Sequence, residues 1–262
     1  MSDKAVLYTS EDGVGVITLN RPDNRNSMTP ELLDAFAEAV RTARSDHEAR
    51  CIVITGSGKC FSAGADFRSQ IQREGRKGVQ AHERSYAMYQ PFLSVLDIEV
   101  PVIAAINGHA IGGGFGLSLA CDIRIGNTEC KYGANFVRLG LSSGMAISYL
   151  LPRIVGPSRA AELMFTGRLF KGAEAAELGL LLEALAPDAV VSRAMELAKT
   201  IAGNAPIAVR LTKQALYRGL GWDARGGALQ EAYAQAATIT TSDVQEGIRA
   251  LLEKRDPQFR GQ

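Results

Sequence analysis

The sequence lacks an excess of either charge, since 29 Lys and Arg residues stand against 28 Asp and Glu residues. The resulting net charge of +1 argues against a surface devoted to nucleic acid, which carries a strong basic excess. The chain also lacks any run approaching the roughly 18 apolar residues that a membrane span needs, and its first ten residues contain no apolar signal core. We therefore expect a cytoplasmic protein with neither nucleic acid nor a membrane as its partner.

Paired cysteines are missing as well. The four cysteines, Cys51, Cys60, Cys121 and Cys130, are widely spaced and form no C-x-x-C pair. This spacing indicates neither a zinc knuckle nor a redox pair, so we predict no metal site and expect buried or loop thiols.

A glycine-rich segment, Ile106 to Arg124 (INGHAIGGGFGLSLACDIR), is the most informative stretch of the chain. The run Val102 to Ile106 before it predicts a strand buried on both faces, and Leu117 to Cys121 resumes a helix-compatible apolar pattern. Gly112-Gly113-Gly114 lies between them and costs backbone entropy. It indicates either a close approach of backbone with N–H groups pointing outward at a helix N-terminus, or tight packing of that helix.

The first part of the chain predicts alternating strands and helices. Val6 to Thr9 and Val14 to Leu19 form a hairpin around Asp12-Gly13. A helix begins at Pro30, capped by Thr29, and ends near Arg44. One face of this helix, which we expect to be buried, carries Leu32, Leu33, Phe36, Ala39, Val40 and Ala43. The remaining elements expected here are a strand at Cys51 to Thr55, a glycine-rich loop at Gly56 to Asp66, a mobile polar segment at residues 71–80, a helix at Ala81 to Leu96 and a strand at Asp122 to Ile125. This alternation favours parallel strands joined by helical crossovers, with ligands beyond their carboxyl ends.

After Gly156-Pro157 the pattern becomes helical and alanine-rich, interrupted by one expected strand at Leu181 to Leu185. The expected helices are Ser158 to Phe165, Ala173 to Leu178, Asp188 to Ala202, Pro206 to Arg218, Ala224 to Thr240 and Asp243 to Lys254. No linker separates the two parts. We therefore predict one domain overall, with a core at residues 1–200 and a helical extension at residues 201–262.

Motifs distributed over almost the whole chain resemble the crotonase family, the enoyl-CoA hydratase and isomerase superfamily. The matching segments are Asn20-Arg21-Pro22 with Asn26, FSAGAD at Phe61 to Asp66, NGHAIGGGFG, CDIRI at Cys121 to Ile125, LGL at Leu139 to Leu141, LLPRIVG at Leu150 to Gly156, TGRLF at Thr166 to Phe170 and EKRDPQF at Glu253 to Phe259. The resemblance implies an α/β fold, a crotonase-like ββα spiral of two sheets with a C-terminal helical trimerisation region. Such trimers often pair into hexamers, and Trp222 and Tyr233 among small apolar residues suit that packing.

The resemblance also implies an acyl-CoA thioester as partner, with coenzyme A as part of the substrate and no other cofactor. Family members polarise the thioester carbonyl with two backbone N–H groups. The matching donors here are Ala63 and Gly113. The stretch from Ala63 through Gly64 and Ala65 to Asp66 would line the thioester and adenine side. Arg25, and Lys254 across a subunit boundary, resemble cations that meet the phosphates; the alternative for both is a solvated surface charge.

Three positions depart from the family pattern. The two glutamates that hydratases use fall at Gly116 and Phe136, and the aspartate of several isomerases and dehalogenating relatives falls at Gly144. General acid–base catalysis needs a titratable group within hydrogen-bond reach. The candidate substitutes are His109, Tyr132, Arg138, Asp66, Glu83 and His82, of which His109 and Tyr132 also suit a structural role and Arg138 a surface ion pair.

Two hypotheses follow from different classes of protein. The first is an enzyme of acyl-CoA enolate chemistry, whether hydratase, isomerase or hydrolase, with a relocated base. The second is an acyl-CoA-binding protein with little or no turnover. A dinucleotide-binding module is disfavoured, because GHAIGGG lacks the G-x-G-x-x-G order and no ribose-binding acid follows at the usual distance.

Overall fold

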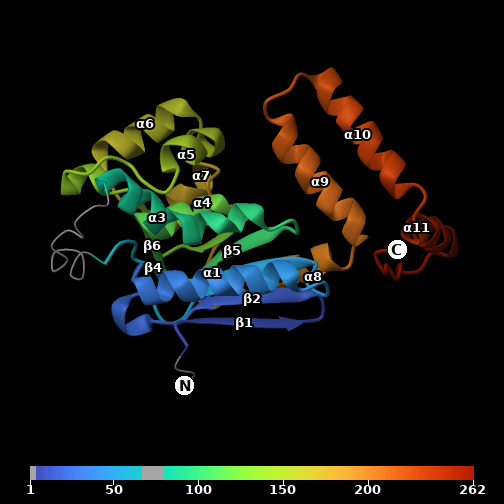
Figure 1. The fold of residues 1–262 in the computed structure, drawn as a ribbon, viewed down its shortest axis with the longest axis horizontal. Helices are drawn as coiled ribbons and strands as arrows, with labels where there is room; N and C mark the ends of the chain where they lie inside the picture. Colours follow the sequence, from blue (N-terminus) through green and yellow to red (C-terminus); the bar gives the residue numbers. More distant parts are fainter. Residues whose placement is uncertain (1–3, 67–79) are drawn as a thin grey trace.

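A computed structural model of the chain describes residues 4–66 and 80–262. Its larger sheet contains six strands in the order β1-β2-β3-β5-β7-β10 (Figure 1). Their bounds are Val6–Glu11, Val14–Leu19, Cys51–Gly56, Val102–Ile106, Ile123–Asn127 and Glu183–Leu185. β1 and β2 are antiparallel around the turn at Asp12-Gly13, and the pairs from β2 onward are parallel. The predicted hairpin and the predicted parallel order are both confirmed.

A smaller sheet, which the sequence patterns did not predict, has the order β4-β6-β8-β9. Its strands are Cys60–Ser62, His109–Ile111, Lys131–Gly133 and Phe170–Lys171. Each of β3, β5 and β7 in the large sheet is therefore followed along the chain by a short strand of the small sheet. This repeat is the predicted ββα spiral. It also corrects the expectation of an irregular loop throughout Gly56 to Asp66.

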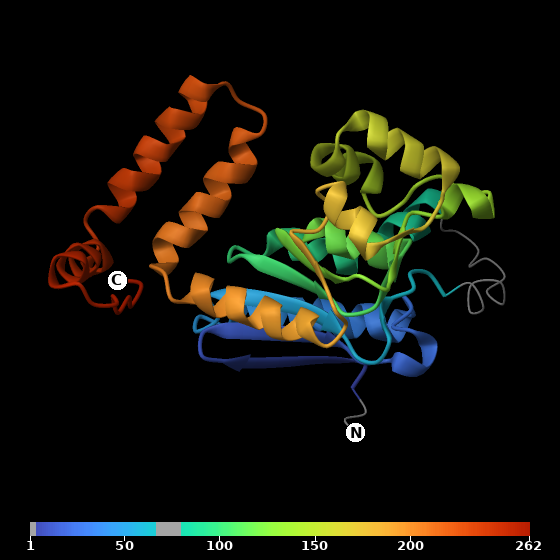
Figure 2. The same cartoon turned by 180° about the vertical axis from the view of Figure 1, so that it is seen from behind.

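Helices cover both faces of the large sheet (Figures 1 and 2). α1 (Pro30–Ser45) begins where Thr29 Oγ1 accepts a hydrogen bond from Leu32 N at 3.2 Å, and its buried residues are the six that the sequence periodicity predicted. α8 (Ala189–Ala202) packs on the other face. Ile52 and Ile54 of β3 belong to the α1 core, whereas Val53 belongs to the α8 core. Since side chains alternate along a strand, β3 is buried on both faces.

The remaining helices of the spiral surround the small sheet. They are α3 (Ala81–Leu93), α4 (Gly113–Ala120), α5 (Ile147–Val155), α6 (Pro157–Thr166) and α7 (Gly172–Glu177), with short 3₁₀ turns η1 (Pro22–Asn24), η2 (Ser94–Asp97) and η3 (Phe136–Leu139). α4 begins at Gly113, earlier than the apolar pattern from Leu117 predicted, and α5 was not predicted. Of the segment 71–80 expected to be mobile, all but Gln80, the N-cap of α3, lies outside the described residues.

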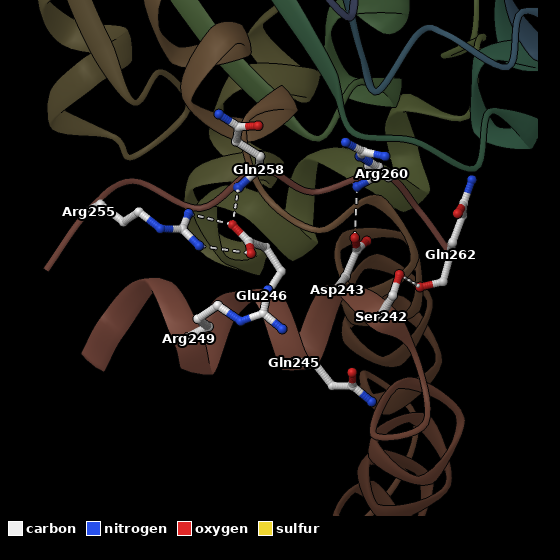
Figure 3. Close-up of a pocket in the computed structure, with 9 residues that line it drawn as sticks. All are labelled: Ser242, Asp243, Gln245, Glu246, Arg249, Arg255, Gln258, Arg260 and Gln262. Carbon is white, nitrogen blue, oxygen red and sulfur yellow. Dashed lines mark hydrogen bonds and ion pairs between the residues drawn. The ribbon is translucent and has the colours of Figure 1, made fainter. Parts of the chain in front are cut away.

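The C-terminal helices α9 (Pro206–Gly219), α10 (Ala224–Thr238) and α11 (Ser242–Glu253) extend away from the sheets (Figures 1 and 2). α8, which packs on the sheet, ends at Ala202. The chain end returns to α11, where Asp243 accepts hydrogen bonds from the N–H groups of Arg260 at 2.7 Å and Gly261 at 2.8 Å (Figure 3). The predicted division near residue 200 remains a prediction.

Within residues 4–66 and 80–262, no helix has the length and apolar character of a membrane span. Across the same residues, no group of three or more His, Cys, Asp and Glu side chains is placed to hold a metal ion. The four cysteines are buried and free, as expected.

Candidate functional site

Two glycine loops from separate parts of the chain meet at the start of α4. A methyl group on Gly64 would lie 2.6 Å from the carbonyl oxygen of Ile111 and 2.8 Å from the nitrogen of Gly113. Gly64 also has φ +80°, a backbone region that favours glycine. The carbonyl of Gly64 accepts a hydrogen bond from Met28 N at 2.8 Å, and Met28 forms a parallel bridge with Ala65. The first loop is therefore held between Met28 and the N-terminus of α4.

A buried asparagine fixes the base of this first loop. The side-chain nitrogen of Asn26 donates to the carbonyls of Cys60 at 2.8 Å and Ser57 at 3.2 Å, while its Oδ1 accepts from Arg21 N at 2.8 Å. Ser62 Oγ in turn donates to the carbonyl of Asn26 at 2.8 Å, across 36 positions of sequence. The position of the loop therefore depends on a segment much earlier in the chain.

Each of the three consecutive glycines has its own structural reason. Gly112 has φ +56°. A methyl group on Gly113 would collide with the sulfur of Met28, and one on Gly114 would collide with the carbonyl oxygen of Ser62. The segment thus combines a left-handed turn with close approach of two other segments, so both readings of the triple glycine apply.

The N–H group of Gly113 is available to an acceptor. Gly113 is buried, is the first residue of α4, and donates to no acceptor within the described chain. The first N–H groups of a helix have no partner inside the helix, and buried backbone N–H groups are nearly always paired. The positive end of the helix macrodipole adds to the attraction for negative charge. The start of α4 therefore suits an oxygen that carries or develops negative charge.

Ala63 does not fit the donor role predicted for it. Its N–H donates to the carbonyl of Arg25 at 3.0 Å, so that hydrogen is already used inside the protein. Ala65 is half-buried, and no acceptor in residues 4–66 and 80–262 takes its N–H. The free N–H beside Gly113 is therefore two residues further along than predicted. Ala63 and Ala65 differ in that the Ala63 N–H is bonded to the carbonyl of Arg25. The local sequence does not reveal this bond.

The predicted phosphate-binding cations lie in different places. Arg25 has φ +60° at the end of η1, and its charge contributes, after burial and Lys131, to a lowered pKa of His109. Arg25 therefore lies beside the first loop. Lys254 ends α11, at the opposite end of the molecule from β4 and β6 (Figures 1 and 2). A single chain does not bring Lys254 to the loops, and its predicted contact across a subunit boundary is untested.

Two of the candidate substitutes for the missing acids are held in structural bonds. The hydroxyl of Tyr132 is buried, donates to the carbonyl of Asn127 at 2.9 Å and accepts from Asn127 N at 2.8 Å; burial raises its pKa. His109 Nδ1 accepts from Lys131 N at 3.0 Å, and burial is the main cause of its lowered pKa. The lone pair of Nδ1 is therefore engaged by the Lys131 N–H and is not free to act as a base.

The other candidates lie at the surface or at the edge of the described chain. Glu83 completes the capping box of α3, where its carboxylate accepts from Gln80 N at 3.0 Å. His82 precedes it and is exposed, as is Arg138 on η3. Asp66 is half-buried and is the last described residue before the gap. Glu83, His82 and Arg138 are therefore in contact with solvent rather than buried in the core.

Other side chains fill the three positions at which acids were expected. A methyl group on Gly116 would collide with the Cβ of Met145. The ring of Phe136 lies 3.8 Å from where a methyl group on Gly112 would be. A methyl group on Gly144 would lie 2.5 Å from the hydroxyl oxygen of Tyr89. An acidic side chain at Gly116 or Gly144 would therefore have to displace Met145 or Tyr89.

The loop before α5 is strained. Met145 and Ala146 are consecutive non-glycine residues with φ +57° and +54°. Such conformations cost on the order of 1–3 kcal/mol each and cluster at functional sites. Ser143, in the same loop, has a buried Oγ without a hydrogen-bond partner in the described chain. Sequence reasoning did not identify Tyr89, Ser143 or Met145.

Together, a ββα spiral of two sheets and two glycine loops that meet at a helix N-terminus define the crotonase-type α/β class. The chain belongs to the enoyl-CoA hydratase/isomerase family, whose model matches residues 9–262.

Named relatives agree with this assignment. The chain is 34% identical to a short-chain-enoyl-CoA hydratase of Clostridium acetobutylicum, over 95% of both chains. It is 33% identical to a crotonyl-CoA hydratase of Syntrophomonas wolfei, over 99% of both. Among solved structures, an enoyl-CoA hydratase of Bacillus anthracis superposes with a TM-score of 0.91 at 35% identity, covering 98% of this chain and 100% of the other.

Proposed function

We propose that this protein binds an acyl-CoA thioester and stabilises its enolate oxyanion through the backbone N–H groups of Gly113 and Ala65. The observation that carries the proposal is the buried N–H of Gly113, which has no acceptor within residues 4–66 and 80–262 and whose nitrogen lies next to Gly64. Two N–H groups aimed at one oxygen favour the enolate over the neutral carbonyl, because negative charge develops on that oxygen. The names of the relatives support an enoyl-CoA hydratase or isomerase as the reaction class.

Coenzyme A enters this proposal as part of the substrate, and no separate cofactor is assigned. Arg25 lies beside the first loop and is proposed to meet the CoA phosphates, with Gly64, Ala65 and Asp66 along the thioester and adenine side. Lys254 would contribute from a neighbouring subunit. The exposed apolar side chains of α11, among them Leu251 and Leu252, support the proposed trimer or hexamer. Sedimentation that finds only monomer at micromolar concentration would contradict this assembly.

The oxyanion proposal is tested with butyryl-CoA labelled with ¹³C at the thioester carbonyl. We expect its infrared carbonyl band to move to lower frequency on binding, because the two N–H groups polarise the bond. Gly113→Pro and Ala65→Pro each remove one N–H and should abolish most of that shift and about 10²–10³-fold of any turnover.

Two matched variants control for shape. Gly113→Ala adds a Cβ against Met28, as proline does, but keeps the N–H, and Ala65→Ser keeps the N–H at the other position. Both should preserve the carbonyl shift. An unchanged shift in both proline variants would overturn the oxyanion assignment.

A second candidate function is acyl-CoA binding with little turnover, which the absence of acids at Gly116, Phe136 and Gly144 favours. Steady-state assays on short and medium trans-2-enoyl-CoA, combined with calorimetric binding, separate the two. Turnover well above background excludes the binder, while micromolar binding with no turnover of any thioester excludes the enzyme.

A further inference from the structure

Of the side chains that fill the three expected acid positions, one carries a transferable proton. Met145 and Phe136 are apolar, but the group against Gly144 is the hydroxyl of Tyr89, 2.5 Å from where a methyl group on that glycine would be. Tyr89 is half-buried on α3 and packs against the main hydrophobic core, so its ring is held in place. A hydroxyl at this point can act as an acid and, once deprotonated, as a base.

A chain of contacts links the start of α4 to the Tyr89 hydroxyl. Gly116 is in the first turn of α4, where its N–H donates to the carbonyl of Gly112 at 3.0 Å. Met145 packs directly on Gly116, and its chain neighbour Gly144 contacts the Tyr89 hydroxyl. An acyl group whose carbonyl oxygen lies at the start of α4 therefore has Met145 and then Tyr89 beside its first carbons.

This hydroxyl is not committed to any bond inside the protein. No group in residues 4–66 and 80–262 forms a hydrogen bond with Tyr89 Oη, and the neighbouring Ser143 Oγ is buried without a partner. Buried polar atoms without a partner, such as Ser143 Oγ, are rare and call for an explanation, such as a ligand or a catalytic role. The backbone strain at Met145 and Ala146, in the same loop, is a second and independent sign of a functional segment.

We propose that the Tyr89 hydroxyl transfers a proton to and from the α-carbon of the bound acyl group. This inference rests on the proposed function, because it needs the thioester carbonyl at Gly113 and Ala65. After the hydroxyl proton is lost to water, the phenolate oxygen takes the α-proton. The C–H bond breaks, its electron pair moves into the thioester to form the enolate, and a new O–H bond forms on Tyr89. In the reverse step that proton returns to the α-carbon and the phenolate is restored.

Hydrogen–deuterium exchange tests this step without knowledge of the natural substrate. The protein is incubated with butyryl-CoA in D₂O, and deuterium at the α-carbon is followed by mass spectrometry. Tyr89→Phe removes the hydroxyl and should slow the exchange by about 10²-fold or more, the usual contribution of an acid–base group. Tyr86→Phe removes a hydroxyl from the same helix at a residue that is 64% exposed, and should leave the exchange unchanged.

Two further readouts on Tyr89→Phe separate a catalytic role from a structural one. The affinity for butyryl-CoA and the infrared shift of its thioester carbonyl should both match the unaltered protein. If exchange is unchanged while both readouts are intact, Tyr89 is not the proton-transfer group and the oxyanion proposal stands. If the unaltered protein shows neither a carbonyl shift nor exchange above the protein-free rate, the proposed function itself fails.

Discussion

The spiral core and the C-terminal helices use their apolar residues in opposite ways. All residues of β3 and β5 are buried, whereas α9 and α10 contain no buried residue. Large apolar side chains on α9, α10 and α11 are exposed, including Leu216, Leu229, Ile248 and Leu252. β3 and β5 therefore complete their packing within one chain. The extension has the composition of a packed helix pair but leaves its apolar surface open, which is the property expected of a region that packs on another subunit.

A buried ion pair joins the two regions. Lys213 on α9 contacts Asp122 at 2.8 Å, and its ammonium also donates to the carbonyls of Ile98 and Val100, both at 2.9 Å. The two side chains of the pair are only 14% and 15% exposed. Asp122 accepts a further bond from Val102 N at 2.6 Å, at the start of β5. The extension is thus attached to the strand that leads into the glycine loop.

The largest effect is expected from matched leucine deletions in the two regions. Leu32→Ala on α1, where the residue is 0% exposed, should lower the free energy of unfolding by about 2–5 kcal/mol through lost burial and a cavity. Leu252→Ala on α11, where the residue is 78% exposed, should cost less than about 0.5 kcal/mol in dilute protein. Urea unfolding measures both.

Repeating the urea series at several protein concentrations sharpens this comparison. The cost of Leu252→Ala should grow with concentration if α11 packs on another subunit, because assembly stabilises the folded chain by mass action. The cost of Leu32→Ala should not. Equal costs in dilute protein would show that the two regions do not differ as described.

Disrupting the Lys213–Asp122 ion pair should have an effect of about the same size. Lys213→Met leaves Asp122 as an uncompensated buried charge and should cost about 3–5 kcal/mol in urea unfolding. Lys199→Met is the matched control, since Lys199 pairs with Asp12 at 3.4 Å in an exposed position and such pairs contribute at most about 1 kcal/mol. Similar small losses in both variants would mean that α9 is not held to the core by this pair.

The smallest effect concerns the returning chain end and appears on acidification. Arg255 forms ion pairs with Glu246, whose pKa is lowered to about 2 from its usual 4.5, chiefly by these bonds (Figure 3). Because the folded-state pKa lies below the unfolded value, the stabilisation is complete above about pH 5 and is lost as the pH falls toward 2.

The protection of the amides in residues 256–262, judged from the exchange rate relative to that of an unstructured peptide at the same pH, should therefore decrease as the pH falls, while protection in β3 stays high. Arg255→Gln should remove this decrease and leave the tail equally unprotected at pH 5. If the pH-dependent loss of tail protection persists in Arg255→Gln, a group other than the Glu246–Arg255 pair causes it.

Sequence patterns predicted those parts of the fold in which one periodicity extends over many residues. The buried face of α1 and its cap at Thr29 were predicted fully, because a 16-residue helix repeats its apolar positions several times. The strands of the small sheet are two or three residues long, too short for any period to be recognised. α5 was missed because it follows two left-handed residues, Met145 and Ala146, of types that rarely adopt that conformation.

The candidate site shows the same limit. Gly113 was predicted from the family resemblance of the segment that contains the triple glycine. The Ala63 N–H donates a hydrogen bond to the carbonyl of Arg25, and the hydroxyl that contacts Gly144 belongs to Tyr89. Neither contact can be inferred from residues that are adjacent in sequence. The fold and the loops were therefore predictable, whereas the hydrogen-bond partners and the group that replaces the missing acids required the structure.

The anchoring of the first loop by Asn26 also determines at which stage of folding the site forms. Asn26, Ser62 and the start of α4 are distant in sequence, so they come into contact only after the chain between them has formed closed loops. Closing such loops is the slow part of folding for parallel sheets. Local helix formation contributes little to these contacts. The capacity to hold a thioester is therefore acquired only when the whole spiral has assembled, and ligand binding can serve as a stringent reporter of complete folding.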